Sequence, residues 1–186
     1  VKKIFSDEEF AAEIAKDGKE LSSANSINFG RLLPQVVYYF SAYAQACAQG
    51  KITAGTPINF CVPTGNFGNI LAAYYAKMLG APIRKFVCAS NVNDVLARFV
   101  ATGVYDPGEN FTVTNSPSMD IRKSSNVERL LWILNDGDSD EVARLMKDFA
   151  EKGRYELNDA AKARLFADFS GGVATPEETE AEMRRM

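Results

Sequence analysis

The segment 58–89 constrains the fold most, because two kinds of secondary structure alternate within about 30 residues. Ile58–Val62 is a short apolar run of strand length, and Ile83–Ala89 is a second one. Between them Ile70–Leu79 contains helix-forming residues, with Gly80 as a C-terminal stop. Strand, helix and strand at this spacing predict a βαβ unit with parallel strands.

The neighbouring segments extend this unit. A second helix is expected over Asn91–Ala101, capped by Asn91 or Asn93, so the order β-α-β-α predicts the α/β class. We expect a three-layer α/β/α arrangement with a mainly parallel sheet. Apolar residues at helical spacing predict a buried helix over Phe29–Gln49, in which Pro34 should mark a first turn or a kink, and Phe111–Thr114 is a candidate short strand.

The last 50 residues differ from the rest in charge and in predicted secondary structure. Residues 1–136 carry 13 basic and 12 acidic side chains, whereas residues 137–186 carry 8 and 12. Helical patterns cover 139–152, 157–168 and 175–186, and Ser139 and Thr175 are suitable caps. We therefore assign residues 1–136 to the α/β domain. Residues 137–186 are expected to form a helical segment of that domain or an insertion in it.

Composition excludes several functions. The net charge of −3, without a basic run, argues against nucleic-acid binding, and no apolar stretch is long enough to cross a membrane. Without an apolar leader either, a cytoplasmic location is expected. Histidine is absent, which excludes Ser–His and Cys–His nucleophiles and most zinc sites, so no metal is expected. Cys47, Cys61 and Cys88 have apolar neighbours and are interpreted as reduced core residues.

The turn after the first strand is the best candidate site. Ligands bind at the carboxyl ends of parallel strands, and two glycines here let the backbone approach a ligand closely. The start of the following helix adds unpaired N–H donors and partial positive charge, so the turn is suited to a phosphate group. A tight turn without a ligand fits the same spacing equally well. The turn contains Thr64, Gly65, Asn66, Phe67, Gly68 and Asn69.

Other polar residues give weaker signals. The Ser22–Asn28 stretch resembles a set of turn and cap residues, although Asn25 and Ser26 are candidates for lining the substrate side of the same site. Arg98, Arg122 and Arg129 could meet an anionic substrate, but solvated surface arginines are the simpler interpretation.

Several separate segments, in order, resemble the threonine synthase family: Leu21–Asn28, Gly30–Phe40, Val62–Asn69, Ala89–Asp94, Ser116–Ile121 and Ser125–Arg129. The resemblance implies a pyridoxal phosphate (PLP) enzyme of fold type II, similar to the tryptophan synthase β chain. Such enzymes convert O-phosphohomoserine and water to threonine and phosphate. The loop corresponding to Gly65–Asn69 binds the phosphate of PLP in that family.

Two departures from the family pattern matter. The family's Schiff-base lysine lies in a phenylalanine–lysine–aspartate context that does not occur here, and the family's carboxy-terminal motifs are also missing. We therefore expect an internal fragment that lacks the amino- and carboxy-terminal parts, contains no catalytic residue and is inactive alone. Two alternatives remain: a non-catalytic phosphate-ligand-binding module of the same fold, and another fold-type-II enzyme such as a threonine dehydratase.

Overall fold

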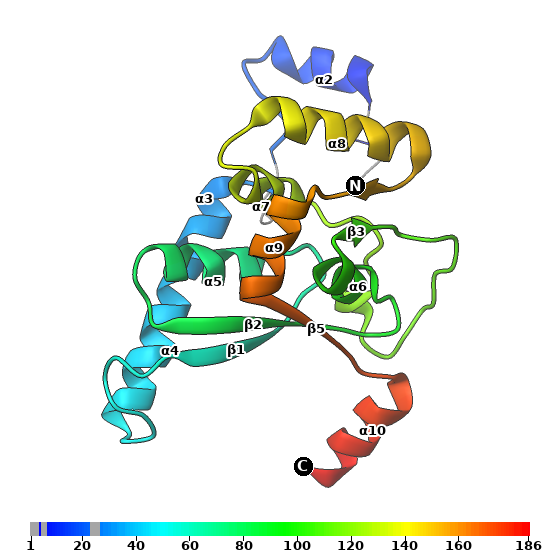
Figure 1. Cartoon of the computed structure of the whole chain (residues 1–186). Helices are drawn as coiled ribbons and strands as arrows, with labels where there is room; N and C mark the ends of the chain where they lie inside the picture. Colours follow the sequence, from blue (N-terminus) through cyan, green and yellow to red (C-terminus); the bar gives the residue numbers. More distant parts are fainter. Residues whose placement is uncertain (1–3, 5–6, 23–26) are drawn as a thin grey trace.

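The computed structural model of the chain describes residues 4, 7–22 and 27–186. Its centre is a three-stranded sheet in the order β1 (Ile58–Pro63), β2 (Ile83–Ser90) and β5 (Phe169–Val173). Both strand pairs are parallel, so all three carboxyl ends lie at one edge (Figure 1). The predicted α/β class with a parallel sheet is confirmed.

The predicted βαβ unit is also confirmed. Helix α5 (Gly68–Met78) connects β1 to β2, and Gly80 follows it with φ of +100°, a conformation that glycine adopts without strain. The helix covers the sheet face that carries Phe86. Tyr74 of α5 contacts the Phe86 ring edge-on at 5.9 Å between centroids, so the helix and sheet share an aromatic core.

The third strand comes from a part of the chain where the sequence predicts only helices. Helix α9 (Asp159–Asp168) runs directly into β5. Phe169, the first residue of β5, packs 5.2 Å from Phe86 and 5.3 Å from Tyr74. Residues 137–186 therefore complete both the sheet and the aromatic core.

The predicted helix over Phe29–Gln49 forms with the interruption expected at Pro34, but its predicted burial is wrong. The structure divides it into α3 (Phe29–Leu32), a 3₁₀ turn η1 (Leu33–Gln35) and α4 (Val36–Ala48), because Pro34 interrupts regular helical hydrogen bonding. It is also mostly exposed, although Leu32, Val36 and Tyr39 are buried. The large apolar side chains that remain exposed here are Phe29, Leu33, Val37, Tyr38 and Phe40.

Two local predictions after β2 are wrong as well. Helix α6 (Val95–Thr102) has Asp94 at its N-cap position, not Asn91 or Asn93, and Phe111–Thr114 forms no strand. Both differences have one cause, a side-chain network around Asp120 that is described below.

The remaining elements surround this centre (Figure 1). Asp138, not Ser139, caps α8, whereas the predicted Thr175 cap of α10 is confirmed and forms a complete capping box. None of the described helices is long and apolar enough to cross a membrane. The other elements are α2 (Glu8–Ala15), β3 (Val104–Tyr105), η2 (Pro117–Met119), α7 (Val127–Leu134), α8 (Ser139–Lys152), β4 (Tyr155–Glu156) and α10 (Pro176–Arg185).

The two faces of the sheet differ. Helices α5 and α9 lie on one side, and α10, which buries none of its residues, lies beyond the other (Figure 1). On that second face Cys61 and Pro63 are exposed, while Val87 and Ala89 are half-buried. The core interpretation of the cysteines therefore holds for Cys88, which is buried, and is wrong for Cys61.

Candidate functional site

The candidate loop, residues 64–69, connects β1 to α5 at the carboxyl edge of the sheet. The Thr64 N–H donates to the Ala89 carbonyl at 3.1 Å, which continues the β1–β2 pairing by one residue. The chain then turns into α5, whose first residue is Gly68. The loop thus occupies the position where ligands bind in parallel sheets.

Phe67 fixes the shape of this loop. It has φ of +63°, a left-handed conformation that is unusual for a residue other than glycine. Its side chain is fully buried, and its ring lies 5.9 Å from that of Phe169. Burial of the ring in the aromatic core offsets the cost of the backbone conformation. Phe67 therefore fixes the loop to the aromatic core and is not a surface residue.

The loop presents unpaired backbone donors. None of the N–H groups from Gly65 to Asn69 donates a hydrogen bond to another described residue. The N–H groups of Gly65, Asn66 and Phe67 belong to the loop. Those of Gly68 and Asn69 belong to the first turn of α5, where the helix dipole adds partial positive charge. Five successive N–H donors without a partner among the described residues, beside a helix N-terminus, fit a phosphate group.

The carbonyl groups of the loop accept hydrogen bonds from residues just before α7. Ser124 Oγ donates to the Gly65 carbonyl. The Asn66 carbonyl accepts from both the backbone N–H of Asn126, at 3.2 Å, and its side-chain Nδ2, at 3.0 Å. The start of α7 therefore binds the carbonyl side of the loop and uses none of the N–H groups from Gly65 to Asn69.

Thr64 and Asn69 brace the loop from within. Thr64 Oγ1 donates to Asn69 Oδ1 at 2.6 Å, and Asn69 Nδ2 donates to the Pro63 carbonyl at 2.8 Å. Asn69 Oδ1 also accepts from the Ile70 N–H. The donor groups of these two side chains are thus used inside the loop, whereas the Asn66 side chain is exposed.

Gly65 is required by close packing. A Cβ atom at this position would lie 2.7 Å from Ile121 Cγ1 and 3.1 Å from the Ser118 carbonyl oxygen. Real Cβ atoms essentially never approach a heavy atom within 3.0 Å. The loop over residues 116–121 therefore rests directly against Gly65.

Asp120 holds that second loop in place. Its carboxylate accepts from the Thr114 N–H at 2.9 Å, Asn91 Nδ2 at 2.7 Å and Asn93 Nδ2 at 3.0 Å. The backbone hydrogen bond from Thr114, followed by the side-chain bonds from Thr114, Asn91 and Asn93, lowers the pKa of Asp120. Asn91 and Asn93 thus tie the end of β2 to the second loop instead of capping α6.

We expect Asp120→Asn to destabilise the chain by about 2 kcal/mol at neutral pH, because the charged acceptor of several hydrogen bonds is lost. The lowered pKa means that Asp120 stabilises the fold fully above its ordinary value, about 4. This contribution disappears as the pH falls through the lowered pKa. Urea unfolding of both proteins from pH 7 to pH 3 should therefore show a difference that shrinks in acid. A difference that stays constant with pH would contradict this role, and the exposed Asp17→Asn controls for loss of one charge.

Five other candidate residues were named from the sequence. Arg122 is half-buried and donates from Nη2 to the Gly108 carbonyl. Asn25 and Ser26 lie outside the described residues. Arg98 pairs with Asp94 at the surface, as expected for a solvated side chain. Arg129 differs from that expectation, because it is half-buried and donates to Asn126 Oδ1 and, at 2.6 Å, to the Ile27 carbonyl. Asn126 is the site residue that sequence reasoning missed, and the surface interpretation of Arg129 is wrong.

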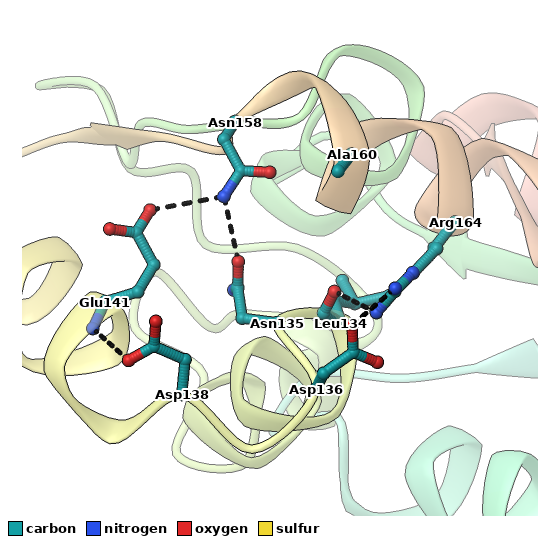
Figure 2. Close-up of a pocket in the computed structure, with 8 residues that line it drawn as sticks. All are labelled: Leu134, Asn135, Asp136, Asp138, Glu141, Asn158, Ala160 and Arg164. Atoms are coloured by element: carbon teal, nitrogen blue, oxygen red, sulfur yellow. Dashed lines mark hydrogen bonds and ion pairs between the residues drawn. The ribbon is translucent and has the colours of Figure 1, made fainter.

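A hollow of about 400 Å³ lies elsewhere, where α7, α8 and α9 meet (Figure 2). Its polar groups are used for structure: Asp138 caps α8, Asp136 pairs with Arg164, and Asn158 joins Asn135 to Glu141. The described residues contain no cluster of histidine, cysteine, aspartate and glutamate suited to a metal. The hollow is lined by Leu134, Asn135, Asp136, Asp138, Glu141, Asn158, Ala160 and Arg164.

Comparison with known proteins gives one consistent result. Human threonine synthase-like 1 is 50% identical over 171 residues, which cover 91% of this chain and 23% of the human protein. Saccharomyces cerevisiae threonine synthase is 36% identical over 195 residues, covering 100% of this chain and 36% of the yeast protein. No protein-family model matches the chain.

Solved structures agree. PLP-bound threonine synthase from Brucella melitensis matches with a TM-score of 0.83 and 39% identity, over 97% of this chain and 36% of that one. The yeast threonine synthase matches with a TM-score of 0.84 and 35% identity, over 98% and 36% of the two chains. The chain thus spans about a quarter to a third of the length of these relatives.

Proposed function

The chain is related by sequence and by fold to one segment of the threonine synthases, and we propose on this premise that residues 64–69 hold the phosphate of PLP. The observation that carries the proposal is the row of N–H groups from Gly65 to Asn69, at the start of α5, that donate to no described residue. The phosphate would be held by these backbone donors and the helix dipole, without a cationic side chain. The loop thus supplies the cofactor anchor of a larger site.

The whole protein would convert O-phosphohomoserine and water to threonine and phosphate. In that reaction the bound cofactor supplies an electron sink. The part played by this chain is to bind and orient, because its N–H donors fix one end of the cofactor and the buried Phe67 keeps the donors in position. Chemical steps at the other end of the cofactor need residues from outside the chain.

Several lysines already have partners far from the loop. Lys77 pairs with Asp168 at 2.5 Å, Lys162 pairs with Glu156, and Lys123 lies over the Phe149 ring. Together with the missing phenylalanine–lysine–aspartate context, this favours a covalent cofactor lysine outside the chain.

Exposed apolar surface supports a further part of the proposal, that the segment is covered by the rest of a longer protein. Val37 and Tyr38 of α4 are 63% and 65% exposed, and Cys61 is exposed on the second sheet face. Large exposed apolar surface on a folded protein often marks an interface. The relatives contain two to three times as much additional chain, which is sufficient to cover it.

Phosphate binding by residues 64–69 is tested by titrating the chain with pyridoxine 5′-phosphate and with pyridoxine, which lacks the phosphate. Neither compound has an aldehyde, so random reaction with lysines is avoided. We expect the phosphorylated compound to bind at least about tenfold more tightly, because hydrogen bonds to a charged group contribute about 1.5–3 kcal/mol each. Equal affinities, measured by isothermal titration calorimetry, would remove the loop assignment.

We also expect the 186-residue chain alone to form no threonine from O-phosphohomoserine in the presence of PLP. The reason is that the chain holds the anchor and lacks the lysine that the reaction requires. Threonine is measured by chromatography, with a complete threonine synthase as the positive control. Threonine formed by this chain, and lost in Gly65→Val, would show that the catalytic group lies within it.

A further inference from the structure

Asn126 lies directly beneath the candidate loop. Asn126 is fully buried. Its backbone N–H and its side-chain Nδ2 both donate to the Asn66 carbonyl, at 3.2 and 3.0 Å. Asn126 occupies the N-cap position of α7, yet its side chain makes no capping bond to that helix. The usual structural use of asparagine at this position is therefore not realised, and the amide serves the loop instead.

The contact at Asn66 determines where the next N–H points. In a trans peptide the carbonyl of one residue and the N–H of the following residue point in opposite directions. Holding the Asn66 carbonyl toward α7 thus aims the Phe67 N–H away from α7. Ser124 Oγ acts in the same way on the Gly65 carbonyl, and so on the Asn66 N–H.

Arg129 sets the orientation of the Asn126 amide. Its Nη1 donates to Asn126 Oδ1, so that Nδ2 of the same amide must face Asn66. Its Nη2 donates to the Ile27 carbonyl at 2.6 Å. The two ends of this guanidinium therefore join the loop to the chain at Ile27, next to the stretch that holds the candidate substrate residues.

We propose that Asn126 is a positioning residue that aims the Phe67 N–H at the cofactor phosphate, and that Arg129 locks its amide and ties the loop to Ile27. The proposal deepens the proposed function and rests on it. Neither side chain touches the cofactor; both act through the orientation of loop peptides.

The sharpest test is Asn126→Asp in the 186-residue chain. The substitution keeps the shape of the side chain and an acceptor for Arg129, but replaces the Nδ2 donor to Asn66 with an oxygen. We expect affinity for pyridoxine 5′-phosphate to fall about tenfold, because the peptide that carries the Phe67 N–H is released. Affinity for pyridoxine should stay unchanged, since only the phosphate contacts are affected. The ³¹P resonance of the bound phosphate should also shift.

Asn135→Asp is the matched control. Asn135 also donates its Nδ2 to a backbone carbonyl, that of Leu131 at 2.8 Å, but at the far end of α7. Its substitution should change neither affinity. Arg129→Lys is the second variant and keeps the assay informative should Asn126→Asp fail to fold. It keeps the charge but loses the two-ended guanidinium, and should weaken phosphate binding about threefold.

The outcomes separate the two proposals. If the unmodified chain binds both compounds equally, the phosphate anchor itself is wrong. If the unmodified chain prefers the phosphorylated compound and both variants keep that preference in full, the anchor stands and the roles of Asn126 and Arg129 are wrong. An equal loss for both compounds in the folded variants also overturns positioning, because it indicates a general disturbance of the site.

Discussion

Replacing Gly65 with alanine should reduce affinity for pyridoxine 5′-phosphate by roughly 10- to 100-fold, the effect of losing one charge-assisted hydrogen bond. The new Cβ would lie 2.7 Å from Ile121 Cγ1 and 3.1 Å from the Ser118 carbonyl oxygen. The second of these is backbone, so the anchor loop must move away from the loop over 116–121. That movement displaces the N–H donors of the loop and so weakens their contact with the phosphate.

The measurement is calorimetric titration of the folded variant, with pyridoxine as the phosphate-free reference. Gly172→Ala is the control, because its Cβ would make only an ordinary 3.7 Å contact with Val87 Cγ1 at the same edge of the sheet. Unchanged phosphate affinity in folded Gly65→Ala would mean that the close contact does not shape the anchor.

Replacing Gly171 with alanine should produce the largest loss of stability, about 3 kcal/mol. A Cβ at Gly171 would lie 2.5 Å from the carbonyl oxygen and 2.9 Å from the Cα of Ala97 in α6. These are backbone atoms within a helix, so no side-chain rotation relieves the overlap. Helix α6 must move away from β5, and the midpoint of thermal unfolding should fall by roughly 10 °C.

The neighbouring glycine again provides the comparison. Gly171 and Gly172 lie in the same strand and point to opposite faces of the sheet, so the pair separates the effect of the α6 contact from the effect of alanine in a strand. Gly172→Ala should change the free energy of unfolding by less than about 1 kcal/mol. Similar losses in both variants would show that α6 does not depend on the absence of a side chain at Gly171.

Features that depend on neighbouring residues could be predicted from the sequence. Ile58–Val62, the glycine-containing turn and Gly80 each signal their conformation locally, so the βαβ unit and the turn after its first strand were correctly located. The resemblance to threonine synthases further favours phosphate binding by that turn. This role stays a prediction until binding is measured.

Features that depend on distant partners could not be predicted from the sequence. Phe169–Val173 contains two glycines and follows a helix without a break, so its strand character comes from pairing with β2 and packing against Phe86. Asn91 and Asn93 look like helix caps until Asp120 is placed beside them. Likewise, nothing near Asn126 in the sequence indicates that its amide reaches Asn66, 60 residues earlier.

The late position of β5 determines the order in which the sheet can form on the ribosome. Ser170 contacts Phe86 across 84 residues of sequence, and ribosomes add about 5–20 residues per second. The βαβ unit is therefore synthesised roughly 4–17 s before the strand that completes its sheet. During that interval β2 presents an unpaired edge and Phe86 lacks its partner Phe169, a state open to pairing with other chains. The nascent chain thus remains open to misassembly until β5 has been made.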